Sequence, residues 1–235
     1  KAYVEEYRNT IMKHKKGIGD TTVIIMESDV GLENARSMAG IELFSYLVED
    51  EPQLASEWLE ALNEKEIRRA KAIADLKLVP IMLTHGDIAY KTGLIHPPEW
   101  LRKEFIPRLK KLVAIYHNCG VKCLFHSDGN LNEILDDLVM AGIDGLNPVE
   151  TTANMHIADI RKKFPSLFLA GGIDASRLLT LGTPEEVRET CKKAIDDTGG
   201  LGYLIGSTTE LLPMVKVENL LSMIEVAHNY KIAAT

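Results

Sequence analysis

The sequence has no long hydrophobic run and no excess of positive charge. Its purely apolar runs are only a few residues long, which excludes a transmembrane helix, and its charged N-terminus lacks the apolar region of a signal peptide. With 27 Lys and Arg against 34 Asp and Glu, the net charge is −7. An acidic chain is poorly suited to bind nucleic acid or an anionic membrane, so neither is expected as a partner.

Cysteine is also scarce. Cys119, Cys123 and Cys191 are too few, and odd in number, for a disulfide framework, so a reducing cytoplasm is the expected location. Low-complexity segments and inter-domain linkers are absent as well, and 46% of the 235 residues are hydrophobic. These features predict one domain over residues 1–235 with a sizeable core. Because the chain begins with Lys1, we expect it to be a piece of a longer protein.

The most informative stretch is VKCLFHSDGN at residues 121–130. A short apolar run between Gly120 and Gly129 predicts a buried strand, and it ends in polar residues that include His126 and Asp128. A helical pattern follows. The strand therefore carries an imidazole and a carboxylate to its C-terminal end, and the same layout recurs along the chain.

Six predicted strands alternate with helices. The strands lie at residues 21–29, 78–84, 121–127, 143–146, 167–170 and 203–205. Each has a carboxylate at or shortly after its C-terminal end: Glu27, Asp87, Asp128, Glu150, Asp174 and Glu210. Continuous apolar strands separated by amphipathic helices indicate a parallel sheet that is covered by helices.

Polar residues at every strand end favour a (βα)8 barrel over an open doubly wound sheet, in which they would gather at one switch point. The predicted fold is therefore α/β, of the (βα)8 TIM-barrel type. Six strands are two fewer than a full barrel has, so we expect the first two βα units to be missing from this chain. Because strand edges would then remain unpaired, we expect this chain either to self-associate into a homo-oligomer or to retain a separately cleaved N-terminal segment.

The expected helices share an amphipathic pattern and recognisable start signals. They lie at residues 3–16, across 31–50 with a break near Gly40, from Pro52 to about Asp75, from Pro97 onward with a kink at Pro107, at 156–163, after a capping box at 183–186, and at about 217–230. Residues 86–96 are long for a connection between a strand and a helix, and they predict a lid.

Two neighbouring predicted strands end in His85-Gly86-Asp87 and His126-Ser127-Asp128. Residues i and i+2 of an extended chain point the same way, and parallel strands lie about 4.8 Å apart. Two imidazoles and two carboxylates could thus converge on one rim as ligands for Zn²⁺ or a similar divalent ion. The alternative is a hydrogen-bonded polar layer in which a histidine acts as acid or base.

Several stretches of the sequence resemble the uroporphyrinogen decarboxylase superfamily. They are GDIAYKTGLI, CLFHSDGNLNEILDDLVMAGIDGLNPVE, GGIDASRLLTLGTPEEV and the closing P-x-V-x-x-EN, and the resemblance covers roughly residues 75–230. It implies a (βα)8 barrel and a place among decarboxylases or corrinoid-linked, zinc-dependent methyltransferases. The latter move methyl groups between a corrinoid protein and a thiol, or take them from donors such as aryl methyl ethers.

Details of the resemblance separate these branches. The substrate of the decarboxylases carries many carboxylates and needs cationic groups, whereas the predicted rim is acidic. The thiol-methylating branch has a zinc motif H-x-C…C, but Asp128 stands where the first Cys would be and Ser207 lies near the second. The pattern E-x14-E-x20-H, associated with O-demethylases, is present as Glu49, Glu64 and His85.

The resemblance therefore implies a corrinoid-protein-dependent methyltransferase that demethylates a small molecule such as an aryl methyl ether, with zinc as Lewis acid and the corrinoid on a partner protein. The expected site residues are metal ligands His85, His126, Glu49 and Glu64; catalytic Asp87, Asp128 and Glu150, the last as general acid; and substrate-binding Tyr90, Asn147, Asp174 and Glu210. One alternative is a metal-free decarboxylase or lyase in which Asp87 or Asp128 protonates a carbanion-like intermediate. A second alternative is an inactive corrinoid-binding or scaffold protein.

Overall fold

A computed structural model describes residues 2–19 and 22–232 of the chain. These residues form two compact units. The first unit consists of Lys1–Asp87, His96–His126 and Ile134–Asp144, and the second consists of Ile88–Ile95, Ser127–Glu133 and Gly145–Thr235. That residues 1–235 form one domain stays a prediction. None of the helices in the described ranges has the length and apolar character needed to cross a membrane.

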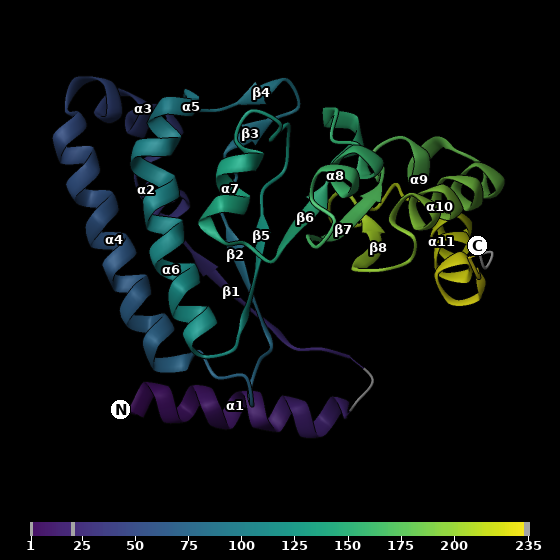
Figure 1. The fold of residues 1–235 in the computed structure, drawn as a ribbon, viewed down its shortest axis with the longest axis horizontal. Coiled ribbons are helices and arrows are strands. Elements are labelled where there is room, and N and C mark those ends of the chain that lie inside the picture. Colours follow the sequence, from purple (N-terminus) through teal and green to yellow (C-terminus); the bar gives the residue numbers. More distant parts are fainter. Residues whose placement is uncertain (1, 20–21, 233–235) are drawn as a thin grey trace. The chain divides into compact units, whose positions relative to one another are not determined.

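Three parallel strands form the centre of the first unit: β1 (Ile25–Asp29), β2 (Ile81–His85) and β5 (Lys122–His126). The helical segments of this unit, drawn in Figure 1, are α1 (Ala2–Ile18), α2 (Leu32–Ala39), α3 (Ile41–Asp50), α4 (Pro52–Ile73), α5 (Pro98–Trp100), the π-helical η1 (Leu101–Phe105), α6 (Ile106–Asn118) and α7 (Leu135–Ala141). On one strand face, buried Phe125 meets Phe105 of η1 edge-on, with ring centroids 5.9 Å apart. Because side chains alternate along a strand, His126 lies on the opposite face.

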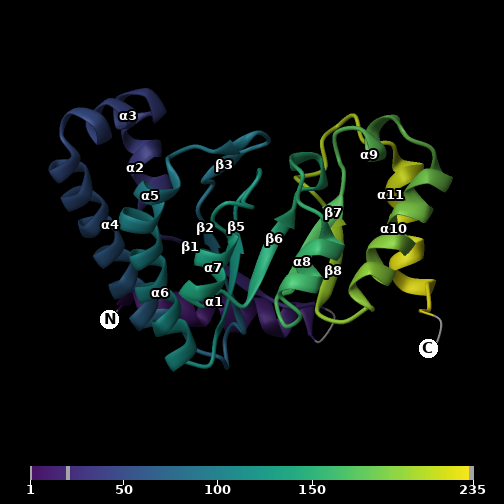
Figure 2. The ribbon, with the colours of Figure 1, turned by 45° about the horizontal axis from the view of Figure 1, so that its top comes forward.

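The second unit has its own three parallel strands, β6 (Gly145–Val149), β7 (Phe168–Ile173) and β8 (Tyr203–Ser207). Its other elements are a short antiparallel pair, β3 (Ala89–Tyr90) and β4 (Gly93–Leu94), the 3-10 turn η2 (Thr151–Ala153), and the helices α8 (Ile157–Lys163), α9 (Leu178–Leu181), α10 (Pro184–Thr198) and α11 (Val217–Asn229). Helices α10 and α11 pack side by side (Figure 2). Within its own unit β8 pairs only with β7, and in the first unit β1 pairs only with β2.

The element types agree with the sequence prediction, and parallel strands alternating with helices confirm the α/β class. The break near Gly40 is present, since α2 ends at Ala39 and α3 begins at Ile41. The kink near Pro107 takes the form of the π-helical turn η1, in which Ile106 N donates to Leu101 O. Proline has no N–H of its own, so the helix adjusts just before it.

Several predicted strand boundaries differ from those of the structure. The strand expected at 21–29, whose first residue lies outside the described ranges, is Ile25–Asp29, and the strand expected at 143–146 is Gly145–Val149. The strand expected from residue 78 begins at Ile81, because the amides of Leu78 and Val79 donate to Asp75 O and a turn takes up these residues. The segment at residues 86–96 contains the β3–β4 hairpin, and its role as a lid stays a prediction. Gly93, the first residue after the turn at residues 91–92, has φ +153, a conformation that side chains rarely adopt.

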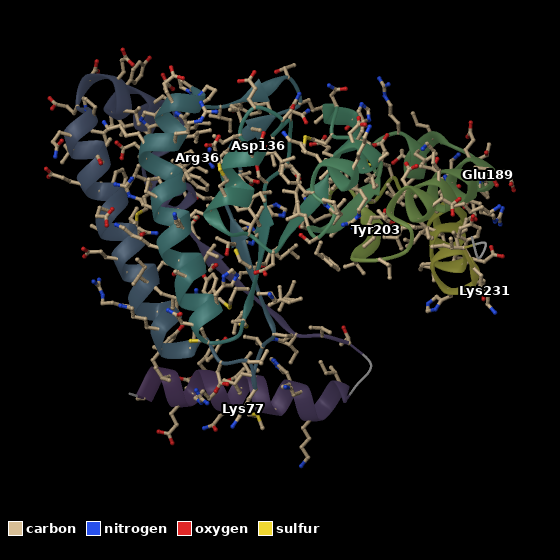
Figure 3. The ribbon with its side chains drawn as sticks, in the orientation of Figure 1. Arg36, Lys77, Asp136, Glu189, Tyr203 and Lys231 are labelled. Carbon is tan, nitrogen blue, oxygen red and sulfur yellow. The ribbon has the colours of Figure 1, made fainter. Side chains whose placement is uncertain are left out.

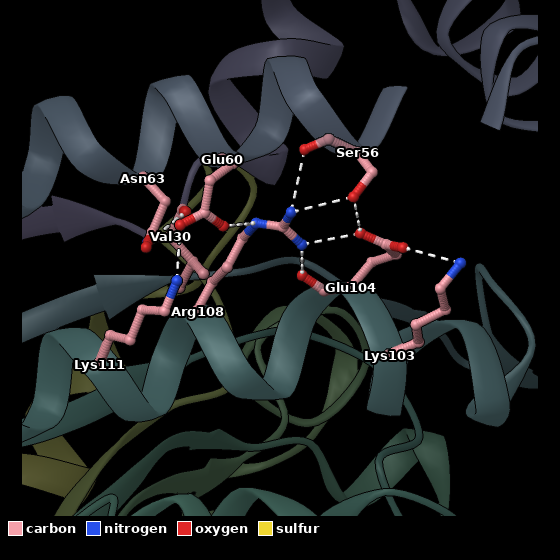
Figure 4. A network of polar contacts seen from close by, with 8 residues as sticks. All are labelled: Val30, Ser56, Glu60, Asn63, Lys103, Glu104, Arg108 and Lys111. Carbon is pink, nitrogen blue, oxygen red and sulfur yellow. Dashed lines mark hydrogen bonds and ion pairs between the residues drawn. The ribbon is translucent and has the colours of Figure 1, made fainter. Parts of the chain in front are cut away.

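A buried ionic network fixes α4 against α6 (Figure 4). Arg108 of α6 pairs with Glu104 Oε2 at 2.8 Å and with Glu60 Oε2 at 3.1 Å, and it donates to Ser56 O at 2.9 Å. Ser56 Oγ donates to Glu104 Oε2 at 2.7 Å. Lys111 Nζ pairs with Glu60 Oε1 at 2.5 Å at the more exposed end of the network. Every charge in it thus has an opposite partner, which is the condition for burying charge without a large penalty.

The capping box predicted at the start of α10 provides a first quantitative test. Glu186 N donates to Thr183 Oγ1 at 3.3 Å and Thr183 N donates to Glu186 Oε2 at 2.8 Å. The variant Thr183→Ala removes the cap and should lower the free energy of unfolding by about 1 kcal/mol in urea denaturation. Thr190→Ala in the same helix is the control, expected to change stability less; an equal loss in both variants would contradict the capping role.

Candidate functional site

The carboxyl ends of β1, β2 and β5 bring Asp29, His85 and His126 into one row. Asp29 is the register partner of His85, and His85 is the register partner of His126. The two imidazole rings lie 4.8 Å apart between centroids, inclined by 47°. Asp87 follows β2, with Oδ1 at 3.6 Å from His126 Nε2. We call these four residues the histidine rim.

Glycine at position 86 leaves room for the aromatic rings of Phe125 and Phe105, which pack against it. A Cβ added at Gly86 would lie 2.7 Å from Phe125 Cζ, too close for any side chain. Gly86 N donates to His126 O at 2.9 Å and continues the strand pairing past His85. From α2, Arg36 Nη2 donates to Gly86 O at 3.0 Å; Figure 3 labels Arg36. The sequence analysis missed this role of Arg36, because nothing in the local pattern places α2 beside the end of β2.

His85 has an unusual polar environment. Its Nε2 is buried and has no hydrogen-bond partner among the described residues, and it lies 3.9 Å from Glu27 Oε1. Buried polar atoms almost always have partners, so one without a partner calls for a functional explanation. An orphaned imidazole nitrogen beside a second imidazole and a carboxylate matches the donor types of a zinc site.

A metal site also needs enough donor side chains within reach of one ion. Within residues 2–19 and 22–232, no group of three or more His, Cys, Asp or Glu side chains is close enough to hold a metal ion. Glu49 and Glu64 lie on α3 and α4, and Glu64 is 60% exposed and pairs with Arg68 Nη1 at 3.7 Å. The assignment of these two glutamates as metal ligands with His85 stays a sequence prediction.

Asp29 is a rim residue that the sequence analysis did not single out, since it assigned Glu27 to this strand end. Burial raises the pKa of Asp29 to about 6. Hydrogen bonds from the backbone amides of Gly31 and Asn34 lower this pKa, and the negative charge of Glu33 raises it further. A carboxyl group perturbed in this way beside two imidazoles is typical of a functional site. The signal in the sequence was the spacing, because Glu27 and Asp29 are two residues apart on one strand face.

The raised pKa of Asp29 predicts how stability depends on pH. The folded state holds this proton more tightly than the unfolded state, so stability falls as pH rises from about 4 through about 6. The variant Asp29→Asn keeps the acceptor oxygen and should gain about 1–3 kcal/mol over the parent at pH 8, and nothing at pH 4, in urea denaturation. Asp75→Asn is the control with the opposite sign, because the Lys77 amide and Arg8 lower the pKa of Asp75. A gain at pH 8 that persists at pH 4 would rule out the charge as its cause.

In the second unit, Glu150 connects three segments at the end of β6. It is 8% exposed, and its Oε2 accepts from Gly129 N at 2.8 Å and its Oε1 from Thr152 Oγ1 at 2.9 Å. Lys91 Nζ, from the β3–β4 hairpin, lies 3.7 Å from Oε1. We call Glu150, Lys91, Gly129 and Thr152 the Glu150 junction. Asp128 precedes Gly129 in the loop that this junction holds.

The predicted substrate-binding residues lie in different settings within the second unit. The side chain of Tyr90 is exposed, while its carbonyl accepts from Asn130 N at 2.8 Å. Asn147 O accepts from Ser127 N at 3.1 Å. Asp174 accepts from the amides of the turn that follows it, and it lines a cavity of about 350 Å³ together with His156 and Lys193. Glu210 is exposed and accepts from Thr209 Oγ1 at 2.9 Å. Their contact with a substrate stays a prediction.

Further along β7 and β8, tight backbone packing leaves no room for larger residues. Tyr203 of β8, labelled in Figure 3, donates from its hydroxyl to Gly171 O at 2.7 Å. Gly171 has φ +96, and an added Cβ would lie 2.8 Å from Pro148 Cβ. The glycine pair at 171–172 therefore allows the close approach of strands β6, β7 and β8.

Comparison with known proteins finds one matching family and several similar proteins. The sequence model of uroporphyrinogen decarboxylase (URO-D) matches residues 4–230. A methylcobamide:CoM methyltransferase MtbA from Methanosarcina acetivorans is 29% identical over 133 residues, and its counterpart from Methanosarcina mazei is 27% identical over 133 residues. In both cases the match covers 57% of this chain and 38% of the relative, so it spans less than two fifths of the curated relatives.

A solved structure, a methyltransferase from Methanosarcina mazei, resembles this chain with a TM-score of 0.74 at 18% sequence identity. The similarity covers 91% of this chain and 60% of that one. At this identity the likeness concerns the fold, and it confirms the predicted α/β architecture of the (βα)8-barrel type, with six parallel strands among the described residues.

Proposed function

The chain belongs to the uroporphyrinogen decarboxylase family, and on that basis we propose that it is a corrinoid-dependent methyltransferase. In this proposal it removes the methyl group of a small donor such as an aryl methyl ether and passes it to a corrinoid on a partner protein. The observation that carries the proposal is the histidine rim, where two imidazoles lie 4.8 Å apart and one has an orphaned, buried nitrogen. The names of the two MtbA relatives support the methyl-transfer class.

The rim residues fit zinc in the kind of donors they offer. His85 and His126 would provide two of the ligands in this proposal, and the ion when bound would supply Lewis acidity toward the oxygen of the methyl donor. Asp87 lies 3.6 Å from His126 Nε2, a spacing that also suits a carboxylate orienting the imidazole.

The proposed reaction also needs a proton donor. When the methyl group leaves an ether for the corrinoid, the C–O bond breaks and the electron pair stays on oxygen, so the departing alcohol or phenol needs a proton. Asp87, in the first unit, and Asp128, in the loop of residues 127–133 of the second unit, are the carboxyl groups we propose for this transfer. Tyr90, Asn147, Asp174 and Glu210 are the proposed substrate contacts.

The negative charge around the histidine rim favours the proposed methyltransferase over a decarboxylase that acts on a polycarboxylate. Glu27, Asp29 and Asp87 gather near the ends of β1 and β2, where Arg36 donates to the Gly86 carbonyl and Arg69 donates to the Glu27 carbonyl. A substrate with many carboxylates needs several cationic partners, and these acids would repel it.

Free cob(I)alamin can replace the partner-bound corrinoid in a direct test. The protein would be incubated with Zn²⁺, cob(I)alamin and a panel of methoxyarenes, and methylcobalamin formation followed by absorbance. Methyl transfer that requires the protein is the expected result. Decarboxylation of an aromatic or tetrapyrrole acid, with no methyl transfer from any donor in the panel, would overturn the proposal.

A further inference from the structure

We propose that Glu150 is a positioning residue, and not the general acid that the sequence analysis expected: it fixes the loop that carries Asp128. The inference deepens the proposed function, on which its kinetic test rests. It starts from the burial of Glu150 and from the occupation of both its carboxylate oxygens, one by a backbone amide and the other by Thr152 and Lys91. A carboxylate held by donors on three chain segments is suited to fixing those segments in place.

The segments that meet at the Glu150 junction are also packed against each other. Gly129 has φ +89, and a Cβ added there would lie 2.6 Å from Ala89 C and 2.7 Å from Tyr90 O. Asn130 N donates to Tyr90 O at 2.8 Å, and Ile88 N donates to Ser127 Oγ at 3.0 Å. The β3–β4 hairpin and the loop of residues 127–133 are therefore packed and hydrogen-bonded together. Asp128 lies between Ser127 and Gly129, and both of these neighbours form hydrogen bonds to other segments.

Glu150 itself is anchored by the turn that follows it. Its carbonyl accepts from Ala153 N at 3.0 Å and from Met155 N at 3.3 Å, while Leu131 N donates to Met155 Sδ at 3.4 Å. Removing the charge of Glu150 should therefore loosen the loop at Gly129 and leave the backbone of residues 150–155 in place. The side chain of Lys91 is 57% exposed and its Nζ lies 3.7 Å from Glu150 Oε1, so its loss should loosen the hairpin and affect the loop less.

Amide hydrogen exchange tests the positioning role without reference to activity. In Glu150→Gln we expect peptides that cover residues 127–133 to exchange on the order of tenfold faster, with little change at 157–163. In Lys91→Met the faster exchange should be confined to residues 88–95. Glu189→Gln is the matched control, because Glu189 is exposed on α10 and pairs with Lys192 Nζ at 2.7 Å. Unchanged exchange at 127–133 in Glu150→Gln overturns the inference, whatever the activity.

Kinetics then separate a positioning residue from an independent acid. Misplacing a reacting group by about 1 Å lowers rates on the order of a hundredfold, so Glu150→Gln should lower kcat by 10- to 100-fold with KM within a factor of about two. If Glu150 acts through Asp128, Glu150→Gln combined with Asp128→Asn should be no slower than Asp128→Asn alone. If the rate losses of the two single variants multiply in the double variant, Glu150 acts independently of Asp128 and the inference is overturned. A protein without methyl-transfer activity refutes the proposed function and leaves the exchange experiment to decide this one.

Discussion

Replacing His126 with alanine is expected to lower methyl transfer on the order of 10²- to 10³-fold while the fold stays intact. The ring lies 4.8 Å from His85 and faces Asp87, so its removal deletes one of the two imidazoles on which the proposed activation depends. The side chain is 22% exposed, so the truncation should leave only a small cavity and lower the melting temperature little. Initial rates with cob(I)alamin and circular dichroism measure the two effects separately.

His117 provides a matched control in the same unit. It also pairs with a carboxylate, with Nε2 at 2.7 Å from Asp144 Oδ2, but it lies at the end of α6 and is more exposed than His126. His117→Ala should keep full activity. Zinc content gives a second measurement, expected to fall in His85→Ala and His126→Ala and to stay constant in His117→Ala. A His126→Ala protein that retains more than a third of the activity would exclude the histidine rim as the reaction centre.

The proximity of the two histidines could be expected from the sequence because it depends on local rules. Apolar runs that end in polar triplets gave β2 and β5, and neighbouring parallel strands bring equivalent residues within a few ångströms. The ring distance of 4.8 Å agrees with that reasoning. Glu64 shows the limit of such rules, because its spacing from His85 in sequence does not specify which side of the long helix α4 it occupies, and it lies exposed beside Arg68.

Long-range contacts account for what the sequence did not reveal. The predicted strand ends at Asp29 as expected, but nothing in its sequence indicates the buried pair in which Ser28 Oγ lies 2.9 Å from Thr84 Oγ1. Likewise, the three donors to Glu150 come from positions 91, 129 and 152, which no periodicity relates. Burial and partner choice decide whether a carboxylate acts as an acid or as a structural anchor, and both are set by tertiary packing.

Replacing Arg108 with methionine should lower the free energy of unfolding of the first unit by about 3–5 kcal/mol. The Arg108 and Glu104 side chains are 8% and 6% exposed, and Arg108 is held by Glu104, Glu60 and Ser56 (Figure 4). Burial by itself would raise the pKa of Glu104, but hydrogen bonds from Ser56, Arg108 and Lys103 lower it. Without Arg108 the buried carboxylate loses its main cation, and an unpaired buried charge is strongly destabilising. Urea denaturation, followed by hydrogen exchange in α4 and α6, measures the loss.

Two further variants determine whether the unpaired charge, and not the lost packing, is responsible. Arg188 forms ion pairs with Glu185 and Glu225 on the surface of α10, so Arg188→Met should change stability by less than about 1 kcal/mol. Combining Arg108→Met with Glu104→Leu removes both charges, and it should recover more than half of the stability that Arg108→Met loses, since apolar residues can replace a buried ion pair. A double variant that is less stable than Arg108→Met alone would mean that Glu104 stabilises the unit through Ser56 and Lys103 without its arginine.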